Sequence, residues 1–231
     1  MDMVIIGASG GIGQYLIKAF SNEYRIFGTY HDADLNLLAP GAKYTHLDIS
    51  DRKTVKGFLK EIAPTLEKPV LIYSPGITYN KPLHKIDDGE WDTTLSVNLT
   101  GAMLVTRGLL PRMREIGFGR IILISSVLSR IAIPGTIAYS ASKAALNAMA
   151  RVLAVENAQK GITANSLALG YYNVGIIRAV PDTYLNEKIL PGIPQGKLGE
   201  PANIVAAVKF IIDADYLTGV TLDINGGIIA P

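Results

Sequence analysis

Tyr139 and Lys143 are the residues whose types and spacing are best suited to move a proton. They lie four positions apart in a segment of helical period, so their side chains share one face of a helix. A free tyrosine titrates at roughly pH 10 and holds its proton too firmly for efficient catalysis near neutrality. A nearby ammonium stabilises the phenolate and lowers its pKa, so we predict that Tyr139 is a general acid/base assisted by Lys143.

Two further polar residues are expected to reach the same region from other segments. Ser126 follows the apolar run Arg120–Ser125, and the carboxyl end of a parallel strand borders the ligand crevice of such a sheet. Its hydroxyl can therefore hydrogen-bond a substrate oxygen. Asn98 is a polar residue within a long helical segment that is otherwise apolar. Either a hydrogen-bonded core amide or a residue that holds a water in a proton relay explains it.

Nucleophilic and metal catalysis have little support in the sequence. No Gly-x-Ser-x-Gly elbow surrounds Ser126, and the three histidines are scattered without the spacing of metal ligands. The chain has no cysteine, which excludes disulfides, thiolate catalysis and cysteine-based zinc sites. We therefore expect no metal site.

A glycine-rich turn joins the first apolar run to the first helical segment, with the sequence Gly7-Ala8-Ser9-Gly10-Gly11-Ile12-Gly13. Glycines let the backbone turn tightly and approach a pyrophosphate, whose charge is stabilised by amides at the helix N-terminus. Any tight turn favours glycine, but the order strand, glycines, helix is the one that a dinucleotide site requires. We expect cofactor phosphates to contact Gly7, Ser9, Gly11, Ile12 and Gly13.

The ends of the next two strands are expected to contact the adenosine half of the cofactor. An acidic residue after the second strand would bind the 2′-hydroxyl and repel a 2′-phosphate, but Tyr30 and then His31 stand there. A neutral residue followed by an imidazole favours NADP(H) over NAD(H), and a turn without any part in cofactor choice is the alternative. Asp48 and Ile49, after the third strand, are assigned to the adenine, although Asp48 could instead be an acid at a helix N-terminus.

Short apolar runs alternate with longer segments of helical period, the pattern of a parallel sheet with helices on both faces. We expect a doubly wound, Rossmann-like α/β fold in a single domain over residues 1–231. The expected strands are Met3–Ile6, Arg25–Tyr30, Lys43–Leu47, Val70–Tyr73, Arg120–Ser125, Thr163–Leu169 and Thr221–Ile224. The expected helices are Ile12–Phe20, Lys53–Ile62, Trp91–Met113, Ser140–Gln159 and Pro201–Ile212. The irregular stretch 171–199, which holds three prolines, is interpreted as a substrate lid.

Composition excludes several other classes of protein. The 22 basic residues are nearly balanced by 20 acidic ones, so no basic field indicates a nucleic acid or an acidic membrane as partner. No apolar run is long enough to span a membrane. The N-terminus enters an apolar run at once, without the pattern of a signal peptide, so we expect a cytoplasmic location. A small-molecule partner fits these observations best.

Together these features resemble the short-chain dehydrogenase/reductase family in its shorter, single-domain form. The glycine turn, Ser126, Asn98 and the Tyr139-x-x-x-Lys143 pair stand in the order typical of that family. The resemblance continues in further segments, namely Asn165–Gly170, Leu198–Pro201, Leu217–Gly219 and Asn225–Gly227. The whole-chain pattern looks most like that of the 3-oxoacyl-thioester reductases.

The resemblance implies seven parallel strands with NAD(P) bound across their carboxyl ends and a carbonyl/alcohol substrate beside it. It implies that Tyr139 is the acid/base, that Lys143 lowers its pKa and holds the nicotinamide ribose, and that Ser126 orients the carbonyl. Asn98 would complete the proton relay. Further cofactor contacts are implied for Ser74, Gly76, Gly170 and Val174. Because the corresponding helices pair between subunits in the family, we expect a homotetramer, with a dimer as the alternative.

Four positions depart from the family pattern. Ile6 replaces the usual Thr before the first glycine, and Ser74 opens Ser-Pro-Gly where Asn-Ala-Gly is usual. Leu169 replaces the usual Pro before Gly170. Val174 stands near the usual Thr that bonds the carboxamide, so only its backbone can make that bond.

Substrate identity is the least determined part of the prediction. Side chains expected to face the substrate are mostly apolar, and they are Ile131, Ile133, Pro134, Tyr171, Tyr172, Ile176, Ile177, Val180, Tyr184 and Leu185. Steroid, sugar and polyol dehydrogenases of the same family are the alternatives. The extended branch of sugar-nucleotide epimerases shares the glycine spacing, but this chain is too short for its substrate domain. A regulatory protein that senses NADP without turnover is an alternative of another class, and such proteins typically lack the Tyr or Lys present here.

Overall fold

Seven parallel strands form a single sheet in the computed structural model, which describes residues 1–229. The strands are β1 (Asp2–Ile6), β2 (Arg25–Tyr30), β3 (Ala42–His46), β4 (Pro69–Tyr73), β5 (Gly119–Ser126), β6 (Ile162–Leu169) and β7 (Thr221–Ile224). Their order across the sheet is β3-β2-β1-β4-β5-β6-β7, so the direction of winding reverses between β1 and β4. The predicted doubly wound sheet is confirmed, and the reversal places the ligand crevice at the carboxyl ends of these strands.

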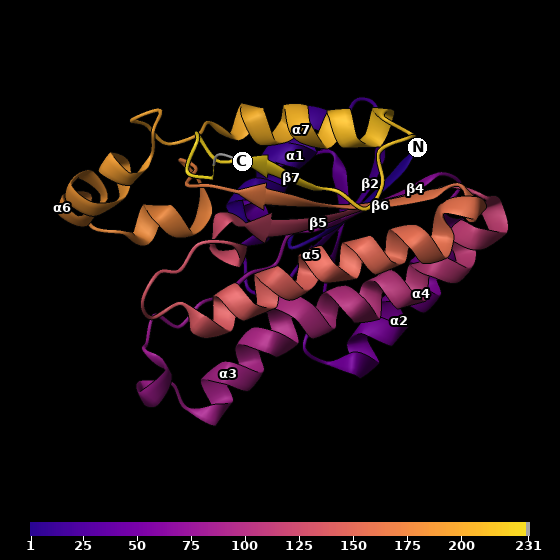
Figure 1. Cartoon of the computed structure of the whole chain (residues 1–231). Helices are drawn as coiled ribbons and strands as arrows, with labels where there is room; N and C mark the ends of the chain where they lie inside the picture. The colour runs from indigo at the N-terminus through magenta and orange to yellow at the C-terminus, as the bar shows by residue number, and fades with distance from the viewer. Residues whose placement is uncertain (230–231) are drawn as a thin grey trace.

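Helices cover both faces of the sheet (Figure 1). On one face α1 (Gly11–Phe20) packs beside α7 (Pro201–Asp213), and α2 (Arg52–Ile62), α4 (Gly101–Ile116) and α5 (Ile137–Asn157) lie on the other. Alternate residues of β1 enter two separate cores, with Met3 and Ile5 in one and Val4 and Ile6 in the other. Successive side chains of a strand point to opposite faces, so a sheet covered on both sides requires such uninterrupted apolar strands.

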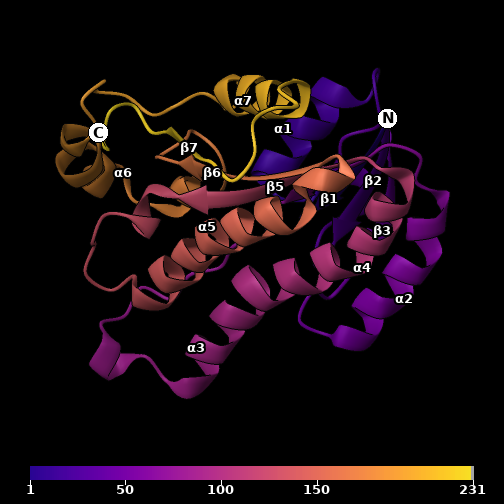
Figure 2. The same ribbon diagram turned by 45° about the vertical axis from the view of Figure 1, so that its right-hand side comes forward.

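The long helix predicted over Trp91–Met113 is present and contains a π turn. It consists of α3 (Asp88–Leu95), a π-helical turn over Ser96–Thr100, and then α4, which follow one another without a break (Figure 2). The helix begins earlier than predicted because Asp87 and Glu90 form a reciprocal capping box at its start. A π turn widens a helix locally, and such turns frequently occur at functional sites.

The segment after β6 is more regular than predicted. Where an irregular stretch was expected over 171–199, the chain forms 3-10 turns at Gly175–Ala179 and Leu190–Gly192, α6 (Asp182–Tyr184) and a π turn at Leu185–Ile189. Two of the three prolines, Pro181 and Pro191, stand at the starts of these turns, where a missing N–H breaks no helical bond. Figure 1 shows this segment projecting beyond the edge of the sheet at the left.

The helix predicted over Ser140–Gln159 also begins earlier, since α5 starts at Ile137 and ends at Asn157. Tyr139 therefore lies in the first turn of α5. Within residues 1–229, no helix is long and apolar enough to cross a membrane. The same residues contain no group of three or more His, Asp and Glu side chains that could hold a metal ion.

Candidate active site

The glycine turn between β1 and α1 leaves the N-terminus of the helix open. Gly7 adopts a φ of +77°, which permits the tight turn. α1 starts without a side-chain cap and has no acidic residue in its first turn, so its first amides can bind an anion. A Cβ at Gly11 would overlap Val174, and one at Gly13 would lie 2.6 Å from the Cα of Ala8. The space and the electrostatics of this turn fit the pyrophosphate of a dinucleotide.

Thr29 of β2 compensates for the departure at Ile6. The N–H of Gly7 donates to the Thr29 hydroxyl (3.1 Å), and the N–H of Ala8 donates to the Thr29 carbonyl (2.8 Å). The hydroxyl that the family places in β1 is thus supplied by the neighbouring strand. The turn keeps its support although Ile6 has no polar atom in its side chain.

A cleft of about 800 Å³ opens beside the glycine turn at the carboxyl edge of the sheet. Most of the predicted site residues line it, namely Gly7, Ser9, Gly11, Ile12, Ser74, Gly76, Ser126, Tyr139, Lys143, Gly170 and Val174. The other predicted site residues are not part of its lining, and these are Gly13, His31, Asp48, Ile49 and Asn98. The structure therefore brings together the phosphate turn and the residues expected to transfer a proton.

Lys143 is buried, with 2 % of its surface exposed. Its Nζ donates to the carbonyls of Ile124 (2.9 Å) and Pro75 (3.2 Å), which fix the position of the ammonium. The same Nζ lies 5.6 Å from the centre of the Tyr139 ring, so the expected pairing on one face of α5 is present. Burial lowers the pKa of Lys143 to about 8.

Tyr139 and Ser126 form the polar centre of the cleft. Burial raises the pKa of Tyr139 above its ordinary value, and the hydrogen bond with Ser126 lowers it by a smaller amount. The predicted lowering of this pKa by the Lys143 ammonium is not found, because burial is the largest cause of the shift and Lys143 is not among its causes. The Ser126 hydroxyl also accepts from the N–H of Leu128 (3.2 Å), which fixes the hydroxyl at the end of β5.

Asn98 lies behind the cleft and is fully buried. Its Oδ1 accepts from the N–H of Ile77 (2.9 Å), while its Nδ2 donates to the Ile77 carbonyl (3.0 Å) and to Ser142 Oγ (3.0 Å). The Ser142 hydroxyl in turn donates to the carbonyl of Tyr139 (2.7 Å). The amide thus ties the loop after β4 to the first turns of α5, which accounts for a polar residue in this helix.

The residues assigned to the adenosine lie at the ends of β2 and β3. The ring of His31 stacks on His46, with centroids 5.9 Å apart and an angle of 27° between the planes. Asp48 accepts from the hydroxyl (2.6 Å) and the N–H (2.9 Å) of Ser50, which lower its pKa together with a smaller contribution from His31. α2 is capped by Asp51 and not by Asp48.

The loop after β4 passes close to the ammonium of Lys143. The N–H of Ser74 donates to the carbonyl of Ile6 (3.1 Å), which continues the pairing of β1 with β4. A Cβ at Gly76 would lie 3.3 Å from Lys143 Nζ, so a glycine lets the backbone approach this closely. The side chain of Ile49, which was assigned to the adenine, packs instead in the core.

Backbone hydrogen bonds in the turn after β6 limit which atoms of Val174 can contact a cofactor. The N–H of Gly170 donates to the carbonyl of Ile224 (2.9 Å), and the N–H of Val174 donates to the carbonyl of Tyr172 (2.6 Å). The N–H of Val174 is therefore already paired within the turn, and the backbone contact to the carboxamide that the resemblance implies stays a prediction. Only the carbonyl of Val174 is left for a cofactor contact, since its side chain is apolar.

The walls of the cleft were predicted in part. The expected apolar residues Ile133, Pro134, Tyr171, Tyr172, Ile176, Ile177, Val180 and Tyr184 line it, whereas Ile131 and Leu185 do not. Thr78, Asn80 and Lys188 also line it and were not predicted. Lys188 stands four residues after Tyr184, a helical spacing that the prolines of this segment obscured.

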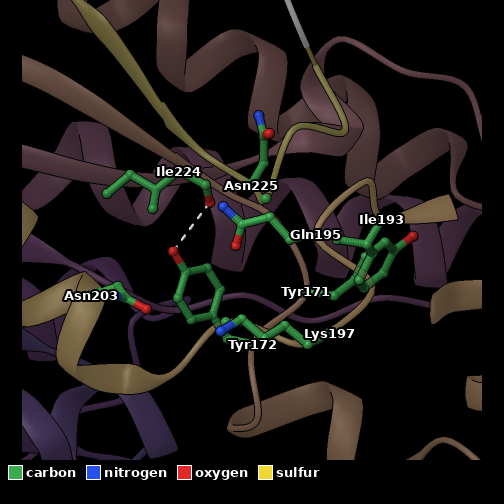
Figure 3. A pocket seen from close by; sticks show the side chains of 10 residues that line it. Tyr171, Tyr172, Ile193, Gln195, Lys197, Asn203, Ile224 and Asn225 are labelled. Atoms are coloured by element: carbon green, nitrogen blue, oxygen red, sulfur yellow. Dashed lines mark hydrogen bonds between the residues drawn. The ribbon is translucent and has the colours of Figure 1, made fainter. Parts of the chain in front are cut away.

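A smaller pocket of about 190 Å³ shares Tyr171 and Tyr172 with the main cleft (Figure 3). The Tyr172 hydroxyl donates to the carbonyl of Ile224 (3.2 Å) at one wall of this pocket. Lys197 contributes a cation to its lining. None of the residues predicted to be catalytic or to bind the cofactor belongs to it, and Tyr171 and Tyr172 line both cavities.

A dinucleotide turn next to a half-buried phenol and a fixed ammonium is the arrangement of an enzyme that transfers a hydride and a proton together. A family model described as short chain dehydrogenase matches residues 2–184. The chain belongs to the short-chain dehydrogenase/reductase family and is an NAD(P)-dependent oxidoreductase.

Relatives cover nearly the whole chain. The acetoacetyl-CoA reductase of Rhizobium meliloti is 35 % identical over 232 residues, which cover 97 % of this chain and 96 % of that protein. The 3-oxoacyl-(acyl-carrier-protein) reductase FabG of Haemophilus influenzae is 31 % identical over 234 residues, with the same coverage of 97 % and 96 %. The crystal structure of gox2181 has a TM-score of 0.89 at 23 % identity, covering 99 % of this chain and 96 % of its own, and supports the fold. The resemblance found in the sequence is confirmed.

Proposed function

We propose that this protein reduces a 3-oxoacyl thioester to the 3-hydroxyacyl thioester with NADPH. The observation that carries the proposal is the position of Tyr139, Ser126 and Lys143 in the same cleft as the glycine turn. The thioester is supported by the relatives, which are named as reductases of acetoacetyl-CoA and of 3-oxoacyl-(acyl-carrier-protein) and match 97 % of this chain.

Each polar residue of the cleft has a role in this reaction. The bound nicotinamide supplies the hydride for the carbonyl carbon. Tyr139 donates its proton to the carbonyl oxygen, and the Ser126 hydroxyl stabilises the negative charge that develops there. Lys143 keeps a positive charge beside Tyr139 and binds the ribose hydroxyls. Asn98 is a positioning residue, because it holds the loop after β4 against α5.

The protonation states suit reduction. Burial raises the pKa of Tyr139, so the side chain holds its proton at neutral pH and can donate it. Lys143, with a pKa of about 8, is mostly a cation at pH 7. Oxidation of an alcohol needs the phenolate instead, which neutral pH disfavours.

The segment after β6 and the loop before α5 enclose the substrate in this proposal. We assign residues 171–199 to a lid within one domain over 1–231. Its residues Ile176, Ile177 and Val180 line the cleft, as do Ile133 and Pro134 from the loop before α5. Apolar walls of this kind suit the short acyl chain of a 3-oxoacyl group better than a sugar or a polyol.

NADP(H) is favoured over NAD(H) because no carboxylate stands at the end of β2, where His31 is exposed. His31→Asp should raise the dissociation constant of NADPH relative to that of NADH by roughly tenfold or more. Fluorescence titration of both cofactors measures this ratio. His84→Asp, the same change at an exposed position of another segment, should leave the ratio unchanged. An unaltered ratio in His31→Asp would show that His31 does not contact the 2′-phosphate.

We also propose a homotetramer in which α5 contributes an interface. α5 exposes Val152 (57 %) and Val155 (85 %), and its Ala144 and Ala148 are exposed as well. Apolar and small side chains on one exposed helix are typical of a surface that a second subunit covers.

The direct test of the function begins with titration of the purified protein with NADPH and NADH. Turnover is then followed as loss of NADPH absorbance with acetoacetyl-CoA, next to a panel of sugar, polyol and steroid substrates in the matching direction. Tighter binding of NADPH and turnover of acetoacetyl-CoA are expected. Binding without turnover on any substrate would favour a sensing role, and preferred turnover of a sugar or steroid would replace the thioester.

A further inference from the structure

The charge of the main cleft is uneven. Two cations line it, Lys143 and Lys188, and no carboxylate within residues 1–229 does. Lys143 is buried and held by two backbone carbonyls, as its role beside Tyr139 requires. Lys188 is exposed, and none of the ion pairs among the described residues includes it. The proton-transfer chemistry gives Lys188 no task.

The local structure directs Lys188 towards the cleft. It lies in the π turn Leu185–Ile189 that continues α6, four residues after Tyr184. Tyr184, Lys188 and Ile189 all line the cleft, and of these Ile189 is buried, with 9 % of its surface exposed. Side chains four residues apart lie on the same side of a helical segment, so this side of the lid faces the substrate.

The rest of the lid that lines the cleft is largely apolar. Ile176, Ile177 and Val180 precede this helical segment and line the same cleft. The lid thus offers apolar side chains followed by a single ammonium that is free of a carboxylate. A ligand that fits this pattern has an apolar acyl end at Tyr139 and an anionic group further along its length.

We propose that Lys188 binds a phosphate on the thioester arm of the substrate and thereby selects thioesters of phosphorylated pantetheine. This inference rests on the proposed function. An ammonium is a compact point charge that suits a phosphate oxygen. Coenzyme A and the prosthetic arm of an acyl carrier protein both carry the 4′-phosphate of pantetheine. Because Lys188 is exposed, salt screens the attraction, and the expected effect is on KM and of moderate size.

The test compares Lys188→Ala with the unaltered enzyme on three substrates, acetoacetyl-CoA, acetoacetyl-4′-phosphopantetheine and acetoacetyl-pantetheine. The variant should raise KM for the two phosphorylated substrates by roughly three- to tenfold and leave their kcat unchanged. KM for the neutral pantetheine thioester should not move. Lys188→Arg should retain the low KM values, and added salt should narrow the difference between enzyme and variant.

Lys197→Ala is the matched control. Lys197 belongs to the same segment and is also exposed, but it lines the smaller pocket of Figure 3 and not the main cleft. Removal of the Lys197 ammonium should leave all three KM values unchanged. In Lys188→Ala, the dissociation constant of NADPH should also stay the same. A larger KM for acetoacetyl-CoA alone would assign Lys188 to the nucleotide phosphates of coenzyme A and not to the 4′-phosphate.

Two outcomes would overturn the assignment of Lys188 while the proposed function stands. One is an unchanged KM for all three substrates in Lys188→Ala, and the other is weaker NADPH binding with equal losses on every substrate. If the unaltered enzyme binds NADPH but reduces none of the three thioesters, the proposed function fails, and the assignment of Lys188 fails with it.

Discussion

Single residues determine the chemistry, and the phenol of Tyr139 is the most direct to test. Tyr139→Phe removes only the hydroxyl that donates the proton, so kcat should fall by about 10²- to 10⁴-fold. Steady-state kinetics with acetoacetyl-CoA measures this loss, and the dissociation constant of NADPH should change little. Tyr216→Phe, at a side chain that is 101 % exposed, is the matched control. Turnover that survives in Tyr139→Phe would remove Tyr139 from the proposed role.

Lys143 should make stability depend on pH. Burial lowers its pKa from 10.5 to about 8, so between these values the unfolded chain holds a proton that the folded protein has lost. The free energy of unfolding therefore rises with pH in this window, whereas below it the buried cation is destabilising in full. In the variant Lys143→Met this position carries no titrating group. The free energy of unfolding of the unaltered protein, relative to that of the variant, should therefore rise by about 2–3 kcal/mol from pH 7 to pH 10. Urea unfolding measures it, and a difference independent of pH would contradict the pKa.

The sequence alone identified the site residues that are brought together by their spacing along the chain. Tyr139 and Lys143 are close because of helical spacing, and the glycine turn is a continuous run. The direction of the Tyr139 pKa was missed because burial depends on side chains from distant segments. Thr78 and Asn80 were missed for a similar reason, since only tertiary packing brings them to the cleft.

Among the elements, the π turn at Ser96–Thr100 places Asn98 where its amide meets Ile77 and Ser142. Asn98→Ala leaves the N–H and carbonyl of Ile77 without these partners, so the free energy of unfolding should fall by about 2–4 kcal/mol. Chemical denaturation measures the change. Asn186→Ala, at an exposed site in the lid segment, should alter it by less than about 0.5 kcal/mol. A small effect in Asn98→Ala would show that the loop after β4 is held by other contacts.

Element types were predictable and their ends were less so. All seven strands lie close to their predicted ranges. For the central strands the reason is that a sheet covered on both faces needs apolar runs of strand length. The helix over Trp91–Met113 was predicted without its π turn, since no periodicity in the sequence separates a π turn from an α turn. The prolines of 171–199 were taken as signs of a loop, but Pro181 and Pro191 stand at the starts of helical turns, where a proline breaks no helical bond.

In the whole molecule, the winding of the sheet reverses between β1 and β4, and this one feature gathers the site. The glycine turn follows β1, Ser74 and Gly76 follow β4, and Ser126 ends β5, so neighbouring strands present them at one edge. This arrangement depends on strand order, which the sequence supplies only through its resemblance to a family with known topology. The location of the cleft was therefore predictable, while the shape of its lid was not.

The assembly is the prediction that belongs to the molecule as a whole. α4 and α5 lie side by side on one face of the sheet (Figure 1), and Val155 of α5 is 85 % exposed. If α5 pairs between subunits, Val155→Glu brings two like charges into a symmetric interface, because a two-fold axis repeats each substitution. Sedimentation velocity should show a particle about four times the 24.8 kDa chain for the unaltered protein and a smaller one for the variant. Leu37→Glu, the same kind of change at a side chain that is 80 % exposed on another part of the molecule, should leave the particle intact. A monomer in the unaltered protein would show that solvent covers this face of α5, and a dimer would limit the pairing to one interface.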